Sequence, residues 1–149
     1  MVQTDIHHPT DNTLLWDVVR VVTRLVRRLG KTLKLRRIKG FCDRTRAARR
    51  RMYEIQRMTT RQRHEQQTRT YRVLIDIAEE VVGNARAGLE RTRTMRGQDT
   101  FADMAIGELR RQIEHFCHLG DRVIDQARRR VLFGEQLATA IPSSSLIPT

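Results

Sequence analysis

Arginine is the residue type in this sequence with the clearest chemistry, because it is both abundant and unevenly placed. Of the 29 basic residues, 26 are Arg. Residues 20–72 hold 19 Lys or Arg and 3 acids, a net charge of +16, whereas the rest of the chain holds 10 basic and 14 acidic residues, a net charge of −4. The guanidinium group is planar, always charged and pairs with phosphate oxygens through two parallel hydrogen bonds. Since 3 acids cannot neutralise 19 cations, we expect this stretch to contact a polyanion.

The densest part of this stretch is the run Arg49-Arg50-Arg51. Three consecutive residues of a helix span about 200°, so only two of them can face a phosphate backbone while Met52 and Ile55 face a core. A merely solvated charged face is the alternative, and a GC-rich genome would also supply Arg in place of Lys. The candidate polyanion contacts are eight arginines: Arg36, Arg37, Arg44, Arg46, Arg49, Arg50, Arg51 and Arg57.

Histidine and cysteine side chains give weaker indications of chemistry. His115, Cys117 and His118 are close in sequence, but neighbouring members are separated by about 200° and 100° around a helix, so they fan out. Glu114 begins Glu-His-Phe-Cys, which is not the Glu-x-x-His pair of metal-binding bundles. Cys42 and Cys117 form no disulfide framework, zinc pattern or supported nucleophile. We therefore assign no metal, no cofactor and no catalytic residue in this chain.

Length and composition limit the classes of protein further. The chain has 149 residues and a mass of 17.5 kDa, which fits one domain. Hydrophobic residues make up 39%, below the usual ~45–50%, so we expect a modest core. No apolar run approaches the ~18–20 residues that span a bilayer, and residues 1–9 lack the cationic and apolar segments of a secretory signal. We expect no membrane partner, no small-molecule substrate and a reducing compartment.

The elements that must position the arginines are helices. Apolar residues recur every three or four positions and no strand-period run follows Pro9, which predicts an all-α fold of about four helices in an antiparallel bundle. The first helix is expected over 13–29, with Gly30 as its stop and a basic loop to Gly40. The second helix is expected to begin at Asp43. The apolar stripe of the first helix is Leu14, Val18, Val21, Leu25 and Leu29.

Two longer helices are expected to follow. A heptad-like seam from Tyr71 predicts a third helix that fades by Arg96. A fourth helix is expected over 101–131, where Gly120 predicts a kink or a close crossing. The seam of the third helix is Tyr71, Leu74, Ala78, Val81, Ala85 and Leu89. The stripe of the fourth is Ala105, Leu109, Ile113, Phe116, Gly120, Ile124 and Ala127.

Three segments outside these helices have weaker patterns. A stretch without apolar side chains begins at Thr59, and we favour a short break near Thr59 and Thr60 over a solvated helical extension. Residues 1–12 are expected to form an extended stub that ends in a turn. Residues 137–149 are aperiodic and are expected to form an unstructured tail. The helical region is therefore 13–136.

The N-terminal residues resemble a known family. Residues 4–25, TDIHHPTDNTLLWDVVRVVTRL, closely resemble a segment of bacterial insertion-sequence transposases of the DDE, RNase H-like class. That family has the pattern T-[DN]-I-H-x-P-T-D-[NS]-x-L-L there. Weaker similarity at 41–55 and 118–136 extends the resemblance over about residues 2–136. In that family the segment follows the strand that carries the first catalytic aspartate. The resemblance implies that this chain corresponds to the helical region between the first and second catalytic aspartates. The matching residues are Thr4, Asp5, Ile6, His7, Pro9, Thr10, Asp11, Asn12, Leu14 and Leu15.

The resemblance also implies what the chain does. Intact members cut and join DNA during transposition with three carboxylates on two divalent ions, Mg²⁺ or Mn²⁺. The first of those carboxylates would precede Met1, and the others would follow the helical region, so none is carried over here. Asp11 is expected to cap a helix and Asp5 to lie at a strand edge. The implied protein is a truncated transposase fragment with an out-of-frame tail, inactive in DNA recombination by itself. It would bind DNA, and associate with itself or an intact copy, at the nucleoid of a bacterial cytoplasm.

Two other classes of function stay open at this point. The chain could be a stand-alone, Arg-rich nucleic-acid-binding or regulatory protein. It could instead be a helix-interaction protein that pairs through the seams at 74–89 and 109–131. A membrane-surface role for the basic amphipathic helix at 13–29 is weaker, since bundle packing accounts for its apolar stripe.

Overall fold

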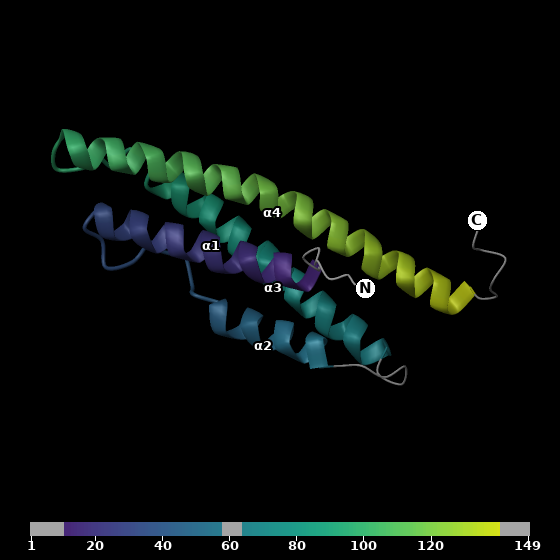
Figure 1. Cartoon of the computed structure of the whole chain (residues 1–149). Coiled ribbons are helices and arrows are strands. Elements are labelled where there is room, and N and C mark those ends of the chain that lie inside the picture. Colours follow the sequence, from purple (N-terminus) through teal and green to yellow (C-terminus); the bar gives the residue numbers. More distant parts are fainter. Residues whose placement is uncertain (1–10, 58–63, 141–149) are drawn as a thin grey trace, which may run out of the picture.

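Four α-helices make up the part of the chain that the computed structural model describes, residues 11–57 and 64–140, with side chains over 11–57 and 67–131. No strand occurs in those residues, and the expected all-α fold is confirmed. The first ten residues, with Asp5, the expected break at Thr59 and Thr60, and the tail from residue 141 lie outside the described residues. The helices are α1 (Asp11–Thr32), α2 (Thr45–Arg57), α3 (His64–Arg91) and α4 (Thr100–Ala140) (Figure 1).

Consecutive helices run in opposite directions, as expected of an antiparallel bundle (Figure 1). The helices α1, α3 and α4 pack against one another around a shared core, and α2 packs on α3 and α1. Figure 1 shows α2 and α4 on opposite sides of the α1–α3 pair. As a result α2 is the outermost helix on its side, and only one of its faces is needed for packing.

The buried face of α1 is shifted from the stripe predicted from the sequence. Leu15, Val19 and Val22 are completely buried, whereas Leu14 and Val21 are only partly buried. The other three predicted residues are buried as expected. Because α1 packs against all three other helices, its buried face is wider than a single stripe and takes in apolar residues on both sides of the predicted one.

The prediction that Gly30 ends α1 is wrong. The helix continues to Thr32, and Lys34 then adopts a left-handed conformation with φ 65°. The N–H of Leu35 donates to the Gly30 carbonyl oxygen at 2.8 Å, the long bond of a Schellman cap. Gly30 instead gives room to Ile38, whose side chain lies 3.4 Å from the position that a Cβ at Gly30 would occupy. Gly30 therefore lies within the helix, in contact with Ile38, and does not end it.

The third helix is longer than predicted. α3 begins at His64 instead of Tyr71, so the apolar-free stretch is helical from His64 onward, and among residues 67–70 only Arg69 is exposed. Such an extension is stable because the helix continues into a well-packed seam, whose interactions offset the weak local preference. The predicted seam is confirmed, with four residues buried and two partly buried: Leu74, Ala78, Val81, Ala85, Tyr71 and Leu89.

The fourth helix crosses its neighbours closely at Gly120. A Cβ at this position would lie 3.0 Å from Val18 of α1 and 3.1 Å from Val82 of α3. The predicted close crossing is therefore confirmed. One residue of the predicted stripe is wrong, because Ala105 is exposed and Ile106 is buried in its place. The helix also continues beyond the predicted end at 131, which places the first four residues of the expected tail in α4.

Both seams that could pair helices between molecules are used inside this chain. The seam of α3 and the stripe of α4 belong to one buried core together with α1. Pairing with another molecule through either seam would first require the bundle to open. The helix-interaction alternative therefore loses the surface on which it depended.

Candidate nucleic-acid interface

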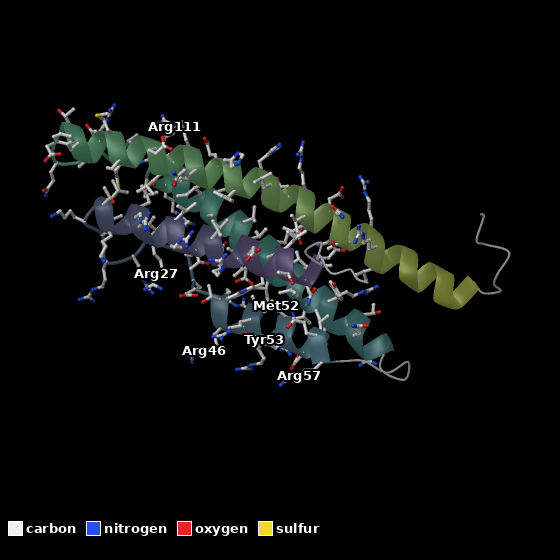
Figure 2. The ribbon with its side chains drawn as sticks, viewed as in Figure 1. Arg27, Arg46, Met52, Tyr53, Arg57 and Arg111 are labelled. Carbon is white, nitrogen blue, oxygen red and sulfur yellow. The ribbon has the colours of Figure 1, made fainter. Side chains whose placement is uncertain are left out.

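The outer face of α2 carries cations at a regular spacing. Ala48, Met52 and Ile55 of this helix are buried toward α3 and α1. On the opposite face, at positions i, i+4, i+7 and i+11 of one helical line, lie the four exposed residues that we call the α2 stripe: Arg46, Arg50, Tyr53 and Arg57. Figure 2 shows Arg46 and Arg57 pointing away from the bundle, with Met52 on the inner side of the helix. None of the three arginines has an ion-pair partner among the described residues.

Two of the eight predicted arginines are neutralised within the protein. Arg44 donates from Nη1 to Glu80 Oε1 of α3 at 2.6 Å, and Arg51 donates from Nη1 to Glu54 Oε1 at 3.0 Å. Both side chains lie beside the buried face of α2 and are only about one-third exposed. The run Arg49-Arg50-Arg51 therefore has two outward members, as the helical geometry required.

Arg49 and Tyr53 form a cation–π pair on this surface. The guanidinium carbon of Arg49 lies 5.4 Å from the centre of the Tyr53 ring, within the range of this interaction. Tyr53 remains 42% exposed, so its ring edge and hydroxyl stay accessible beside the arginines. The tyrosine hydroxyl can donate a hydrogen bond to a phosphate oxygen and thus adds a neutral contact to the stripe.

The predicted start of α2 is close to the observed one. α2 begins at Thr45, and the Asp43 carboxylate accepts hydrogen bonds from the Thr45 backbone N–H at 2.9 Å and the Thr45 hydroxyl at 2.6 Å. Asp43 also pairs with Arg27 of α1 at 3.2 Å. The Thr45 hydroxyl and, to a smaller extent, Arg27 hold the pKa of Asp43 below its usual range. This carboxylate therefore stays ionised and ties the start of α2 to α1.

The remaining two predicted arginines, Arg36 and Arg37, are exposed on the segment 33–44 that joins α1 to α2. This segment is anchored by Ile38, which is only 4% exposed. The Ile38 side chain lies between Gly30 of α1 and Gly88 of α3, where an added Cβ would come within 2.9 Å of it. The Arg91 guanidinium also donates to a backbone oxygen of this segment at 2.7 Å. The two arginines are thus displayed on a fixed segment.

A second line of cations lies on α1, outside the eight arginines predicted as polyanion contacts. Its members share the i, i+4, i+7, i+11 spacing and lie opposite the buried face of that helix. Arg20 pairs with Asp17 at 3.0 Å, and Arg27 with Asp43, whereas Arg24 and Lys31 are exposed without a partner in the described chain. The spacing itself was the available signal. The residues of this α1 stripe are Arg20, Arg24, Arg27 and Lys31.

His115, Cys117 and His118 do not converge on one point. His115 and His118 are exposed while Cys117 between them is buried, so the three side chains fan around α4 as predicted. Burial raises the pKa of Cys117 to about 11, which keeps the thiol protonated and unreactive. Within residues 11–57 and 67–131 no group of three or more His, Cys, Asp or Glu side chains is placed to hold a metal ion.

Asp11 is the first residue of α1, two residues before the predicted start of the helical region at 13, and its carboxylate interacts favourably with the helix dipole. The prediction that residues 11 and 12 belong to a non-helical stub is therefore wrong. It is largely buried and pairs with Arg130 of α4 at 3.3 Å. The nearby Tyr71 ring is also mostly buried, and burial together with the Asp11 charge raises the pKa of its hydroxyl. Asp11 therefore has a structural role that joins the start of α1 to α4.

Two further findings bear on function. No helix in the described residues contains a segment that is both long and apolar enough to cross a membrane. No known protein family, curated protein or solved structure matches this chain.

Proposed function

We propose that this protein binds duplex DNA through the outer faces of α2 and α1. The observation that carries the proposal is the α2 stripe, in which Arg46, Arg50 and Arg57 lie in one line opposite the core. Surface arginines in globular proteins usually stand beside acids of their own helix, which limits their contribution to binding. None of these three forms an ion pair within the described residues, although the Arg46 charge contributes to lowering the pKa of Asp43. Arg50 and Arg57 in particular keep their charge available to a partner.

The length and spacing of the α2 stripe suit a phosphate backbone. Four residues of helix rise about 6 Å, and the line from Arg46 to Arg57 is about 16 Å long. The α1 stripe adds a second, roughly parallel line of cations, and Arg27 and Arg46 lie on the same side of the molecule (Figure 2). Cations on such a face displace condensed counterions from DNA, which is the main source of sequence-independent affinity. Because phosphate contacts carry little sequence information, we expect weak sequence selectivity.

The resemblance to insertion-sequence transposases favours DNA over other polyanions. In our proposal the chain shares ancestry with the helical region of such a transposase and keeps the DNA-contacting role of that region. It contributes no catalytic residue, and its cations position DNA without any step that involves Mg²⁺ or Mn²⁺. Binding to an intact transposase copy is a further consequence to be tested once DNA binding is established.

The experiment is a salt titration of binding to a short fluorescent duplex, followed by anisotropy. Each neutralised phosphate contributes about −0.9 to the slope of log K against log salt. Replacing Arg46, Arg50 and Arg57 together by Gln should flatten this slope by about 2–3 and weaken binding at every salt concentration. Far-UV circular dichroism should be unchanged, because all three side chains point away from the core.

The matched control removes three arginines from the other side of the molecule. Arg111, Arg122 and Arg129 lie on one face of α4 and are all exposed. Their replacement by Gln makes the same change in net charge, and the slope should fall by less than about 1. Equal effects of the two triple variants would mean that binding follows net charge alone and would refute an interface on α2. A flat salt dependence of the unmodified protein would refute the proposal altogether.

A further inference from the structure

A basic hollow lies between the C-terminal end of α1 and the segment that follows it. Its volume is about 700 Å³, within the usual ~300–1,000 Å³ range of small-ligand sites. One wall is apolar and is formed by Val26, Leu35, Ile38 and Phe41. Ile38 and Phe41 belong to the hydrophobic core, and Leu35 is half-buried against it. The apolar wall is therefore part of the packed structure and is already formed without a ligand.

The rest of the hollow is strongly cationic. Five basic side chains line it, and Asp43 is the only acid among its lining residues. That carboxylate is already engaged by Arg27 and Thr45. The other four basic residues have no ion-pair partner in the described part of the chain: Arg28, Lys31, Arg36 and Arg37. Four like charges around one concavity repel one another, and an anion between them would relieve that repulsion.

A second hollow shows that this arrangement is not a general property of the surface. It lies between α3 and α4 and has a volume of about 490 Å³. Three arginines line it, yet each is already bound within the protein. Arg86 pairs with Asp121 at 2.7 Å, Arg93 pairs with Glu90, and Arg110 donates to backbone oxygens at the end of α3. This second hollow has no unpartnered arginine to offer an anion.

We propose that the basic hollow binds one nucleotide, with the base against the apolar wall and the phosphates among the four cations. Inorganic phosphate would satisfy the cations but leave the exposed part of the wall, chiefly Leu35, in contact with water, because Val26, Ile38 and Phe41 are each at most 9% exposed. An apolar ligand would leave the cations repelling one another. A nucleotide joins a flat, weakly polar ring system to an anion and so matches both halves of the hollow. The four cations bind the phosphates as charge-assisted donors, and Arg36 and Arg37 approach them from the side opposite α1.

Such a nucleotide can come from two sources, a free nucleoside triphosphate or an unpaired nucleotide in a DNA strand. The hollow adjoins α2, since Asp43 lines it and α2 begins two residues later. A strand lying along the α2 stripe would therefore reach the hollow directly. Binding of an unpaired nucleotide of a DNA strand rests on the proposed DNA binding and extends it. Binding of a free nucleoside triphosphate does not depend on that proposal.

The test compares ATP with tripolyphosphate, which has the same phosphate chain and no base, by isothermal titration calorimetry on the full chain. We expect ATP to bind about tenfold more tightly, which corresponds to about 1.4 kcal/mol, because this requires the base to remove only about 55 Å² of apolar surface from water at about 25 cal/mol per Å². Replacing Leu35 by Ser should abolish that preference and leave tripolyphosphate binding unchanged. Replacing Arg36 and Arg37 by Gln should weaken both ligands. Equal affinities for ATP and tripolyphosphate in the unmodified protein would reduce the hollow to a cluster of cations and overturn the proposal.

Two more variants separate this proposal from the α2 interface. Asp43→Asn removes the one carboxylate of the hollow and frees Arg27, while its amide oxygen can still accept from the Thr45 N–H. We expect tighter binding of ATP in this variant, and weaker binding would contradict the proposed phosphate position. The triple replacement of Arg46, Arg50 and Arg57 should leave the preference for ATP over tripolyphosphate intact even where duplex binding is lost.

The source is decided with DNA. A short duplex that carries one unpaired thymidine is compared with the fully paired duplex. Tighter binding of the former that disappears in Leu35→Ser supports an unpaired nucleotide of a strand as the occupant. No difference between the duplexes, together with the ATP preference, supports a free nucleotide. If ATP binds no more tightly than tripolyphosphate, the proposal is overturned whatever the two duplexes show.

Discussion

The α4 side and the α2 side of this bundle carry similar side chains but differ in how their arginines pair with acids. On the α4 side, arginines stand one helical turn from acids, so Arg111 pairs with Glu108 at 2.7 Å and Arg129 with Asp125 at 2.9 Å. The Arg111 hydrogen bond holds the pKa of Glu108 below its usual value. On the α2 side the only acid within the helix is Glu54, which forms an ion pair with Arg51. The two faces therefore differ in local net charge, because acids one helical turn away offset the arginines of α4, whereas α2 carries a single acid.

The α1 side of the molecule shows the intermediate case. Its stripe has the same spacing as the α2 stripe, but half of its members are engaged by Asp17 and Asp43. Exposed pairs of this kind contribute roughly 0–1 kcal/mol, so a phosphate could displace either acid at small cost. We therefore expect α1 to support DNA binding and α2 to dominate it.

The largest effect on this comparison should come from Ile38→Ala. Ile38 is buried between α1 and α3 and fixes the segment that carries Arg36 and Arg37. Removing three carbons at a buried position should lower the free energy of unfolding by about 2–5 kcal/mol. The change should also weaken ATP binding, since the apolar wall of the basic hollow is lost with it. Urea denaturation followed by circular dichroism measures the first effect.

A matched variant distinguishes anchoring from general damage to the core. Ile106→Ala removes the same atoms from a buried position in α4, far from residues 33–44 in the chain. It should destabilise the fold to a similar extent but leave the affinity for ATP in the folded protein unchanged. If Ile38→Ala and Ile106→Ala altered ATP binding equally, the proposed role of Ile38 in fixing the segment that carries Arg36 and Arg37 would be refuted.

An effect of intermediate size on DNA affinity is expected when an acid is placed one helical turn from the arginines of α2, as on α4. In Arg46→Glu, the new carboxylate stands one turn before Arg49 and Arg50 and near the helix N-terminus, where an acid is favourable. DNA affinity should fall about tenfold to a hundredfold, since charge-assisted contacts contribute roughly 1.5–3 kcal/mol each. The stability of the protein should stay the same or rise by a few tenths of a kcal/mol. Anisotropy and thermal unfolding, measured on the same sample, report the two effects.

The control for this variant is Arg122→Glu on α4. Arg122 is exposed and has no ion-pair partner in the described chain, and its replacement makes the same change in net charge. Duplex binding should weaken less than about threefold, through the long-range field alone. A loss as large as that of Arg46→Glu would show that the two faces do not differ in binding.

The sequence predicted those features that depend on local periodicity. The number of helices, the seam of α3 and the close crossing at Gly120 follow from apolar spacing and from the cost of a helical glycine. The role of Gly30 did not follow, because it depends on Ile38 packing against that position from a different segment. The exact buried face of α1 also escaped prediction, since it depends on how many helices surround it.

The candidate site could be predicted in part for the same reason. The helical wheel of α2 correctly required that one of Arg49, Arg50 and Arg51 turn inward. The neutralisation of Arg44 could not be foreseen, because its partner Glu80 is 36 residues away. The basic hollow is likewise a tertiary feature, formed when the segment after α1 folds back against that helix.

The smallest expected effect concerns the cap that ends α1 and leads into the segment 33–44. Lys34 holds φ at 65°, a conformation that costs a residue with a Cβ roughly 1 kcal/mol. Lys34→Gly removes this strain but increases the entropy of the unfolded chain, so the free energy of unfolding should rise by only about 0.5 kcal/mol. Gly40→Ala is the opposite case, because φ there is 83° and the new Cβ would collide with the Arg91 guanidinium. It should lower the midpoint of urea denaturation, whereas Lys34→Gly raises it. Because Lys34 does not line the basic hollow, Lys34→Gly should also keep the preference for ATP over tripolyphosphate. A shift of the urea midpoints of Lys34→Gly and Gly40→Ala in the same direction would show that backbone strain does not set the shape of this turn.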